Sequence, residues 1–384
     1  MSTAPKRVTI DARYLRTKHS GIGRYTEQFI THILKLDPEL QLHLITHPES
    51  PAPFGEAHPR ITYTVFNAPA NSISTRASLA KIVHRTNPDL YHSPFNFLPA
   101  NLQVPSIFTL HDIMWLIHPE YCTSSRARRL VQGTFYQHVL SHSLHEASQV
   151  MTVSHYSKKD IETHYPHTKG RVHVSYNGLD PYFHPMAPHK TWETISHLVP
   201  PRRKFVLVVG QGSPYKNHIG ALEGFLEAFA DDPQIYLVMV RRFSRGTAPR
   251  LKQLLRSKAL NSRLITLDYV SVEELRALYN AASCFLFPSI YEGFGIPPLE
   301  AMACGTPVVA SNIGAPAEVC GEAAELVDPY DYKSIAHGLK QVIYNPSQRD
   351  LRIQLGLEHV KKFTWEQCAS QVLNAYTSTL HAQA

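Results

Sequence analysis

The 384-residue chain lacks several features that would decide its class at once. No stretch approaches the run of about 20 apolar residues that a membrane-spanning helix needs. The first eight residues hold no apolar signal segment, so we expect the protein to remain in the cytoplasm. The five cysteines are odd in number and form no close pair, which argues against a disulfide framework. No Asp-x-Asp pair occurs, so the carboxylates that commonly hold a bridging divalent metal are missing.

Positive charge exceeds negative charge, with a formal net charge of +7. This balance suits an anionic partner such as a nucleotide, a phospholipid surface or a nucleic acid. Basic residues are dispersed, and no helix-turn-helix, zinc-finger or RNA-binding sheet motif is present, so we expect no nucleic-acid partner. One dense cluster, Arg126, Arg128 and Arg129, begins a helix-like stretch that also carries aromatic residues. The cluster could lie on an anionic membrane surface, and an amphipathic helix packed on its own sheet explains it equally well.

Strand-like and helix-like segments alternate along the chain, and the alternation begins twice. The second series follows a segment with five prolines and predicts a strand at 205–210, a helix at 271–282 capped by Ser271, and a strand at 284–288. Repeated βα units with apolar strands indicate parallel sheets covered by helices on both faces. The fold class is therefore α/β, with two Rossmann-like domains facing across a cleft. Their expected boundaries are residues 1–180, a linker at 181–203, residues 204–362, and a last segment at 363–384.

The segment 289–311 carries the most specific pattern in the chain. Two carboxylates stand eight positions apart, Glu292 on a glycine-rich loop and Glu300 in the helix that follows. Ligands of parallel sheets bind where strands end and helices begin. A helix starting near Pro297 would direct free N–H groups and its positive dipole end at such a ligand. The glycines on both sides of Phe294 let the backbone approach it closely. Phosphates and sugar hydroxyls suit this arrangement.

This segment resembles the Glu-x7-Glu signature of retaining glycosyltransferase family 4, whose usual form is E-G-F-G-x-x-x-x-E-A-M-A-x-G-x-P-V-V. The resemblance implies a GT-B fold, in which the first domain lies on the acceptor side, the second binds a nucleotide sugar, and the last helix returns to the first domain. It implies that Glu300 accepts hydrogen bonds from the ribose hydroxyls, and that Glu292 faces the transferred sugar and its oxocarbenium-like charge. It also implies that the sugar is held by a short run of backbone at Gly293, Phe294, Gly295 and Ile296.

A second glycine-rich turn lies between an apolar strand and a helix, and it holds Lys216. Without a carboxylate pair for a metal, the protein itself must neutralise a diphosphate, and Lys216 beside a helix N-terminus suits that anion. We therefore expect no metal or other cofactor beyond the nucleotide sugar as co-substrate. The turn resembles the family's G-x-x-x-P-R-K-N, in which Arg and Lys both bind phosphates. Tyr215 stands in the Arg position here, so Arg241 and Arg242 are the candidates for the second cation. The donor-binding residues expected in this turn are Gln211, Gly212, Lys216 and Asn217.

The first half carries two further motifs of the family. Ser20-Gly21-Ile-Gly23-Arg24-Tyr25 follows the first strand. It resembles the family's loop over the donor phosphates, which makes Gly21 and Gly23 candidates for donor binding. His111, followed by Asp112 at a strand end, resembles the family's His-Asp, where the histidine meets the donor sugar. We expect His111 to orient a hydroxyl or share a proton, with a structural histidine as the alternative.

Three other histidines fall on one face of a helix, at a spacing that zinc ligands use. They are His138, His142 and His145. Because no cysteine lies near and the chain holds 23 histidines, we interpret this face as solvated or packed rather than as a metal site.

The family resemblance extends over nearly the whole chain and is most similar to bacterial mannosyl- and rhamnosyltransferases of surface-polysaccharide synthesis. It favours GDP-mannose or a similar donor, and a glycan or lipid-linked acceptor. Retention by internal return and retention through a covalent intermediate both stay open. A GT-B epimerase or phosphorylase is a rival function. A non-catalytic sugar- or nucleotide-binding module is another, against which the intact Lys216, Glu292 and Glu300 argue.

Overall fold

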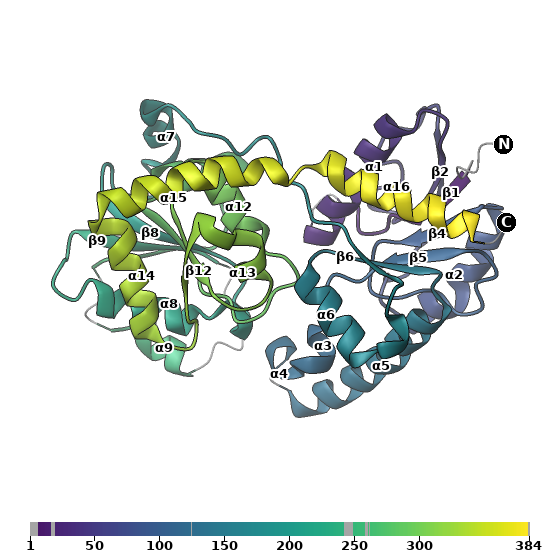
Figure 1. The fold of residues 1–384 in the computed structure, drawn as a ribbon, viewed down its shortest axis with the longest axis horizontal. Coiled ribbons are helices and arrows are strands. Elements are labelled where there is room, and N and C mark those ends of the chain that lie inside the picture. The colour runs from purple at the N-terminus through teal and green to yellow at the C-terminus, as the bar shows by residue number, and fades with distance from the viewer. Residues whose placement is uncertain are drawn as a thin grey trace. The chain divides into compact units, whose positions relative to one another are not determined.

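The computed structural model describes residues 7–16, 20–123, 125–241, 249–257, 260 and 262–382, so Arg242 lies outside the described residues. The chain forms two compact units, and each contains one parallel sheet (Figure 1). Unit 1 comprises Met1–Ile117, Arg126–Gly178 and Phe363–Ala384. Unit 2 comprises His118–Ser125 and Leu179–Lys362.

Within the described residues, the sheet of unit 1 has seven parallel strands in the order β3-β2-β1-β4-β5-β6-β7. The direction of strand addition reverses between β1 and β4, which pair through Val8 and Leu90. A reversal of this kind leaves a crevice at the carboxyl ends of the two strands, where ligands of such sheets bind. The strands are β1 (Arg7–Asp11), β2 (Gln41–Thr46), β3 (Ile61–Val65), β4 (Leu90–Ser93), β5 (Ser106–Thr109), β6 (Gln149–Thr152) and β7 (Val172–Val174).

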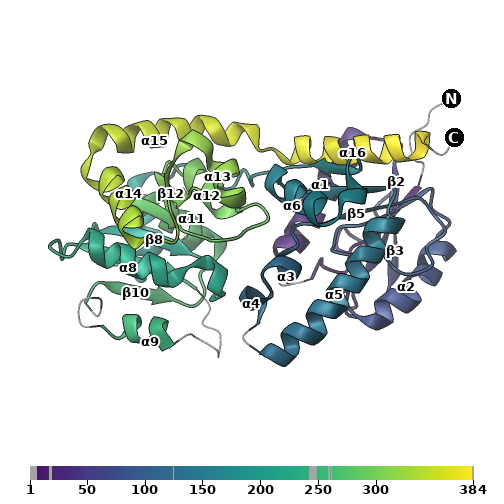
Figure 2. The ribbon, with the colours of Figure 1, turned by 60° about the horizontal axis from the view of Figure 1, so that its bottom comes forward.

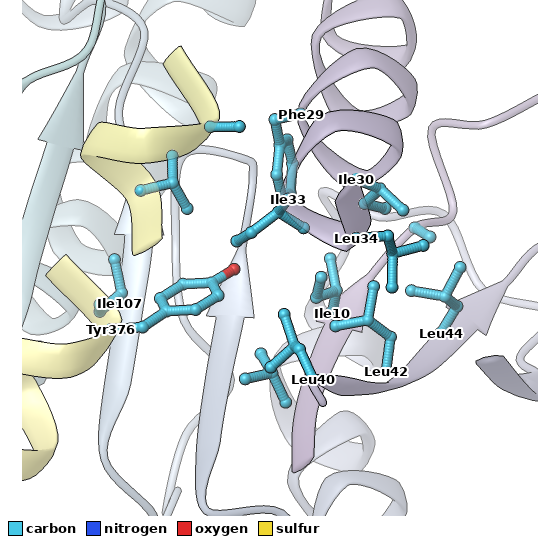
Figure 3. Packing of buried hydrophobic residues seen from close by; sticks show 14 of the residues in the cluster. Ile10, Phe29, Ile30, Ile33, Leu34, Leu40, Leu42, Leu44, Ile107 and Tyr376 are labelled. Atoms are coloured by element: carbon cyan, nitrogen blue, oxygen red, sulfur yellow. The ribbon is translucent and has the colours of Figure 1, made fainter. Parts of the chain in front are cut away.

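The first and last helices of unit 1 lie side by side in both views of the fold (Figures 1 and 2). Tyr376 of the last helix packs beside Ile33 and Ile107 (Figure 3). Its hydroxyl also bonds Nδ1 of the buried His92 at 2.7 Å. Burying each large apolar side chain of this kind contributes about 1.5–3 kcal/mol. The helices of unit 1 are α1 (Gly21–Leu36), α2 (Ile73–Arg85), α3 (Met114–Ile117), α5 (Arg126–Glu146), α6 (His155–His164), η1 (Pro166–Thr168) and α16 (Trp365–His381).

The sheet of unit 2 has, among the described residues, six parallel strands in the order β10-β9-β8-β11-β12-β13. Its strand order reverses between β8 and β11, where Cys284 pairs with Val206. The fold class predicted from the sequence, α/β with two Rossmann-like parallel-sheet parts, is confirmed. The strands are β8 (Lys204–Val209), β9 (Ile235–Val240), β10 (Leu264–Leu267), β11 (Cys284–Phe287), β12 (Val308–Ser311) and β13 (Ala324–Val327).

Helices surround the sheet of unit 2 (Figure 1). One of them shows the predicted serine cap, because Ser271 Oγ accepts from Glu274 N at 3.1 Å and the Glu274 carboxylate accepts from Ser271 N. The helices are α4 (Pro119–Cys122), α7 (Pro188–Ile195), η2 (Pro214–Lys216), α8 (His218–Ala228), α9 (Pro249–Leu255), α11 (Val272–Ala281), α12 (Ile296–Ala303), α13 (Gly314–Cys320), η3 (Gly321–Ala323), α14 (Tyr332–Tyr344), α15 (Pro346–His359) and η4 (Val360–Lys362).

The proline-rich segment 181–203 contains a helix that the sequence pattern did not predict. Helix α7 begins at Pro188, where a proline is tolerated because the first helical N–H needs no partner within the helix. Ile195 is fully buried, and α7 packs against α11. Upstream, the Met186 N–H donates to Asn280 Oδ1 of α11 at 2.7 Å. The segment is therefore an integral part of unit 2 rather than an irregular connection.

Helix α5, which begins with the basic cluster, differs along its length. Val139, Leu140 and Leu144 in its second half are buried in the core of unit 1. In its first turns, by contrast, Leu130 is 74% exposed and Val131 is 70% exposed. The packed-helix interpretation therefore holds for the second half, and the first turns present an apolar pair to solvent. No helix within the described ranges is both long enough and apolar enough to cross a membrane.

Candidate active site

The turn after β8 is fixed by Asn217, which caps α8 from a left-handed conformation with φ 52° and ψ 46°. Asparagine adopts this region more readily than most residues because its short polar side chain bonds the local backbone. Its Oδ1 accepts from Gly220 N at 3.1 Å, and its Nδ2 donates to the Pro329 carbonyl at 2.6 Å. The side chain of Lys216 lies close over Gly210, where a Cβ would stand 3.3 Å from the lysine Cδ. The turn thus holds Lys216 in one place.

The loop after β11 is joined directly to that turn. The Ile290 N–H donates to the Tyr215 carbonyl at 2.7 Å, and Ser311 Oγ donates to the Ser289 carbonyl at 2.6 Å. Gly295 has a φ of 99°, a value that favours glycine, and it caps α12. Of the other residues predicted to hold the sugar, Phe294 is buried, while Gly293 and Ile296 are half-buried.

The two candidate catalytic residues of unit 2 form an ion pair with each other. Lys216 Nζ donates to Glu292 Oε1 at 2.5 Å, and the two side chains are only 13% and 12% exposed. The ammonium also lies 5.1 Å from the centre of the Phe287 ring. Partial burial strengthens such an attraction relative to one at the surface. The pair stands after β8 and β11, the adjacent strands between which the strand order reverses.

Glu300, the second carboxylate of the signature, is buried in α12 with 7% exposure. The Tyr279 hydroxyl of α11 donates to its Oε2 at 3.0 Å. The sequence pattern did not mark Tyr279 as a site residue. The available signal was its place on the apolar face of a well-capped helix, because a buried tyrosine hydroxyl usually needs a hydrogen-bond partner.

Two further basic side chains lie near this turn. Arg241, at the end of β9, is 2% exposed, and burial lowers its pKa to about 10 against the opposing charge of Asp268. His218 opens α8 and is 4% exposed; burial and then the charges of Arg241 and Lys216 lower its pKa to about 3. His218 is therefore neutral at physiological pH. Its Nε2 has no hydrogen-bond partner among the described residues. His218 was not among the predicted site residues, although its position directly after Lys216 and Asn217 was a usable signal.

The remaining residues of this turn are more open. Gln211 is exposed and Gly212 is half-buried, so their backbone and side-chain groups are accessible between β8 and η2. No group of three or more histidine, cysteine or acidic side chains is arranged to hold a metal ion in the part of the chain that the structure describes.

The candidates in unit 1 lie at the carboxyl edge of its sheet. Ser20 caps α1 by accepting from Gly23 N at 3.1 Å, and a Cβ on Gly23 would stand 2.5 Å from the Tyr14 carbonyl oxygen, so only glycine fits there. A Cβ on Gly21 would meet nothing within 4 Å, so packing within the protein does not require that glycine.

His111 follows β5, and its ring is held in one orientation. Nε2 donates to the Pro94 carbonyl at 3.2 Å, and the imidazole and the Tyr25 ring pack in a T-shaped arrangement with centroids 5.1 Å apart. Burial lowers the pKa of His111 to about 4, partly offset by the bond to Pro94. The histidine is therefore neutral at pH 7, and since Nε2 carries the proton, Nδ1 is a hydrogen-bond acceptor.

Two family profiles match successive parts of the chain. The profile described as Glycosyltransferase Family 4 matches residues 19–183, and Glycosyl transferases group 1 matches residues 192–357. A relative from Escherichia coli, O-antigen chain mannosyltransferase B, is 31% identical over 287 residues, which cover 75% of this chain and 74% of the relative. The chain belongs to glycosyltransferase family 4. The sequence-based identification of this family is confirmed.

Solved structures share the fold of this glycosyltransferase. Sucrose-phosphate synthase from Thermosynechococcus elongatus has a TM-score of 0.75 at 21% identity, over 98% of this chain and 99% of that one. Anabaena HepE in complex with UDP and glucose has a TM-score of 0.71 at 20% identity, over 97% of this chain and 100% of that one. The family 4 glycosyltransferase thus has the GT-B fold.

Proposed function

We propose that the enzyme is a retaining, metal-independent hexosyltransferase of polysaccharide synthesis in the cytoplasm. Its donor is GDP-mannose or a similar nucleotide sugar, and its acceptor is a hydroxyl of a glycan or of a lipid-linked oligosaccharide. The observation that carries the proposal is the pair Lys216–Glu292, 2.5 Å apart at the strand-order reversal of unit 2. The name of the Escherichia coli relative, an O-antigen chain mannosyltransferase, supports the choice of sugar and pathway.

The donor diphosphate is neutralised by groups of the protein. Lys216 donates to it from the turn after β8, and the buried Arg241 at the end of β9 supplies a second positive charge in the place of the absent arginine. The free N–H groups at the start of α8 add their partial charge. Glu300 accepts from the ribose hydroxyls, because a carboxylate has two oxygens that match a vicinal diol.

Sugar transfer separates charge, and the site offers a group for each sign. Negative charge builds on the leaving phosphate as its bond to the anomeric carbon lengthens, and Lys216 stabilises it. Positive charge builds on the sugar, and the Glu292 carboxylate faces it. In unit 1, neutral His111 offers Nδ1 as an acceptor for a hydroxyl group, the role that its resemblance to the family's His-Asp motif implies. The charges of Lys216 and Glu292 are already in place before the reaction, so stabilising the transition state costs no reorganisation of the protein.

A panel of nucleotide sugars tests the donor, with and without chelator. We expect GDP-mannose to raise the melting temperature of the enzyme, since a ligand at 100 times its Kd stabilises the native state by about 2.7 kcal/mol. Transfer to an acceptor should continue in EDTA. A larger shift with another donor would replace the assignment of GDP-mannose, and activity that requires added Mg²⁺ or Mn²⁺ would contradict metal independence. Turnover without acceptor would favour an epimerase, and a requirement for free phosphate would favour a phosphorylase.

The first turns of α5 are the proposed contact with an anionic membrane, where the enzyme would meet a lipid-linked acceptor. Arg126 and the exposed Leu130 and Val131 combine positive charge with apolar surface. Arg128 and Arg129 add to the charge of the sequence there. Attraction to acidic headgroups and burial of the two apolar side chains together suit a helix that lies on the membrane surface.

Co-sedimentation with vesicles tests this contact. We expect the enzyme to bind vesicles that contain about 30% phosphatidylglycerol, a composition that gives them a negative surface. This binding should weaken as the salt concentration rises. The double variant Leu130→Ser/Val131→Ser should bind roughly 100-fold more weakly, since each of the two aliphatic side chains contributes about 1.5 kcal/mol or more when buried and about 1.4 kcal/mol is a factor of ten. Tyr269→Ser, which alters a residue that is 86% exposed in unit 2, is the matched control. Equal binding by the double variant and the control would contradict the assignment.

A further inference from the structure

Tyr279 is a buried residue whose hydroxyl reaches the proposed nucleotide site. It is completely buried on α11, and its ring packs edge-on against Phe285 and Phe183, with centroids 5.3 Å and 5.9 Å away. These contacts leave the ring little freedom. The hydroxyl donates to Glu300 Oε2 at 3.0 Å. The aromatic packing therefore fixes the position of the hydroxyl that holds the Glu300 carboxylate.

The backbone of the same residue is anchored from a second direction. The Thr306 hydroxyl, just before β12, donates to the Tyr279 carbonyl, which also accepts from the Ala282 N–H at 3.2 Å. Thr306 is 2% exposed. The end of α11 is thereby tied to the loop that follows α12, the helix that carries Glu300. Both ends of the contact between Tyr279 and Glu300 are held by the same small region of unit 2.

We propose that Tyr279 is a positioning residue for ribose recognition. It holds one oxygen of Glu300 through a hydrogen bond from its hydroxyl, which fixes the orientation of the carboxylate. Each carboxylate oxygen can accept more than one hydrogen bond, so Glu300 keeps acceptor capacity for the ribose hydroxyls. The inference rests on the proposed function, in which Glu300 binds the ribose of the donor.

A merely structural tyrosine would affect stability and all ligands alike, whereas a positioning residue affects only the contribution of the ribose hydroxyls. Tyr279→Phe keeps the ring and its packing and removes the hydroxyl alone. The informative quantity is therefore the ratio of the Kd of 2′,3′-dideoxy-GDP to that of GDP, measured by calorimetry. UDP and its dideoxy analogue replace this pair if the donor panel shows a uridine donor.

The wild-type enzyme should prefer the ribonucleotide, and Tyr279→Phe should lower that preference about tenfold, because a hydrogen bond to a charged group contributes about that factor. The affinity for the dideoxy compound should change little. Glu300→Gln should lower the preference similarly, and the double variant should lower it no further, since Tyr279 acts through Glu300.

Tyr376→Phe is the matched control, because it removes another buried tyrosine hydroxyl, one that bonds His92 in unit 1. It should leave the ribose preference at the wild-type value even if it lowers the melting temperature. If Tyr279→Phe prefers GDP over the dideoxy compound as strongly as the wild type does, the positioning role of Tyr279 is overturned and the proposed function stands. Wild-type enzyme without any preference for ribose would overturn the role of Glu300 and the inference with it. Wild-type enzyme that binds no nucleoside diphosphate would overturn the proposed function as well.

Discussion

Glu292→Gln is expected to bind free nucleoside diphosphate about tenfold more tightly than the wild type while its kcat falls by about 10²–10³. Binding and turnover should thus move in opposite directions. In the structure the Glu292 carboxylate is 2.5 Å from the Lys216 ammonium, so it already occupies one donor of the group proposed to hold the diphosphate. The arriving diphosphate must share Lys216 with this carboxylate and is repelled by it.

Removing the charge of Glu292 ends that competition. Two unit charges 5 Å apart repel by about 3 kcal/mol at an effective dielectric constant of 20, which is more than enough for a tenfold gain in affinity. The loss of kcat has a separate cause, since glutamine cannot stabilise the positive charge that develops on the sugar. During turnover, Lys216 donates to the diphosphate instead of to Glu292, and the Glu292 carboxylate then faces the sugar.

Calorimetry with GDP and a steady-state transfer assay check the two halves of this prediction. Glu325→Gln is the matched control, because Glu325 pairs with Arg352 at 2.8 Å with similar partial burial, on β13 in the same unit. The control should bind GDP and turn over like the wild type. If Glu292→Gln binds GDP more weakly than this control, Glu292 supports Lys216 rather than competing for it. Unchanged kcat would remove Glu292 from the chemistry.

Lys216→Met should weaken the binding of GDP about 100-fold and leave the binding of guanosine nearly unchanged. The substitution keeps most of the stem volume over Gly210 and removes the ammonium, so the diphosphate loses its nearest cation. It also leaves Glu292 partly buried without its positive partner, and the repulsion of the diphosphate then acts without compensation. The two effects add in the same direction, which explains the large factor.

Guanosine is the internal control for this prediction, because it makes the base and ribose contacts without the phosphates. Arg352→Met is the control variant, since it removes the cation of another partly buried pair in unit 2. Equal losses for GDP and guanosine in Lys216→Met would show damage to the whole pocket and would remove Lys216 from the phosphate site. In Lys216→Met/Glu292→Gln part of the affinity for GDP should return, because the repelling carboxylate is gone.

The positions of the candidate residues along the chain were predictable, and their mutual contacts were not. Glycine-rich turns after apolar strands indicated that Lys216 and Glu292 stand at the carboxyl ends of parallel strands. The predicted Rossmann-like fold class implies that the first strand, β8, lies beside the fourth, β11, but no residue pattern showed that the two side chains meet. An ion pair between residues 76 positions apart arises from this tertiary arrangement alone.

Residues that support the site were harder to find than residues expected to touch a ligand. Tyr279 looks like an ordinary apolar-face residue of α11, and only its 3.0 Å bond to Glu300 separates it from the core. His218 follows the family motif by one position, and its burial near the charges of Lys216 and Arg241 is a tertiary feature that this position alone did not reveal. Prolines obscured α7, because a proline that starts a helix and a proline that prevents one look alike in a single sequence.

Unit 1 is built from separate stretches of the chain, and this affects the order in which the two units can finish folding during translation. Trp365, Cys368, Val372 and Tyr376 of α16 are all buried against the first segments of unit 1. During translation those early segments emerge long before α16, and the intervening chain takes on the order of ten seconds to synthesise at 5–20 residues per second. Throughout that interval the apolar surface that α16 later covers is open to chaperones. Unit 2 is therefore able to finish folding first, although most of unit 1 is translated before it.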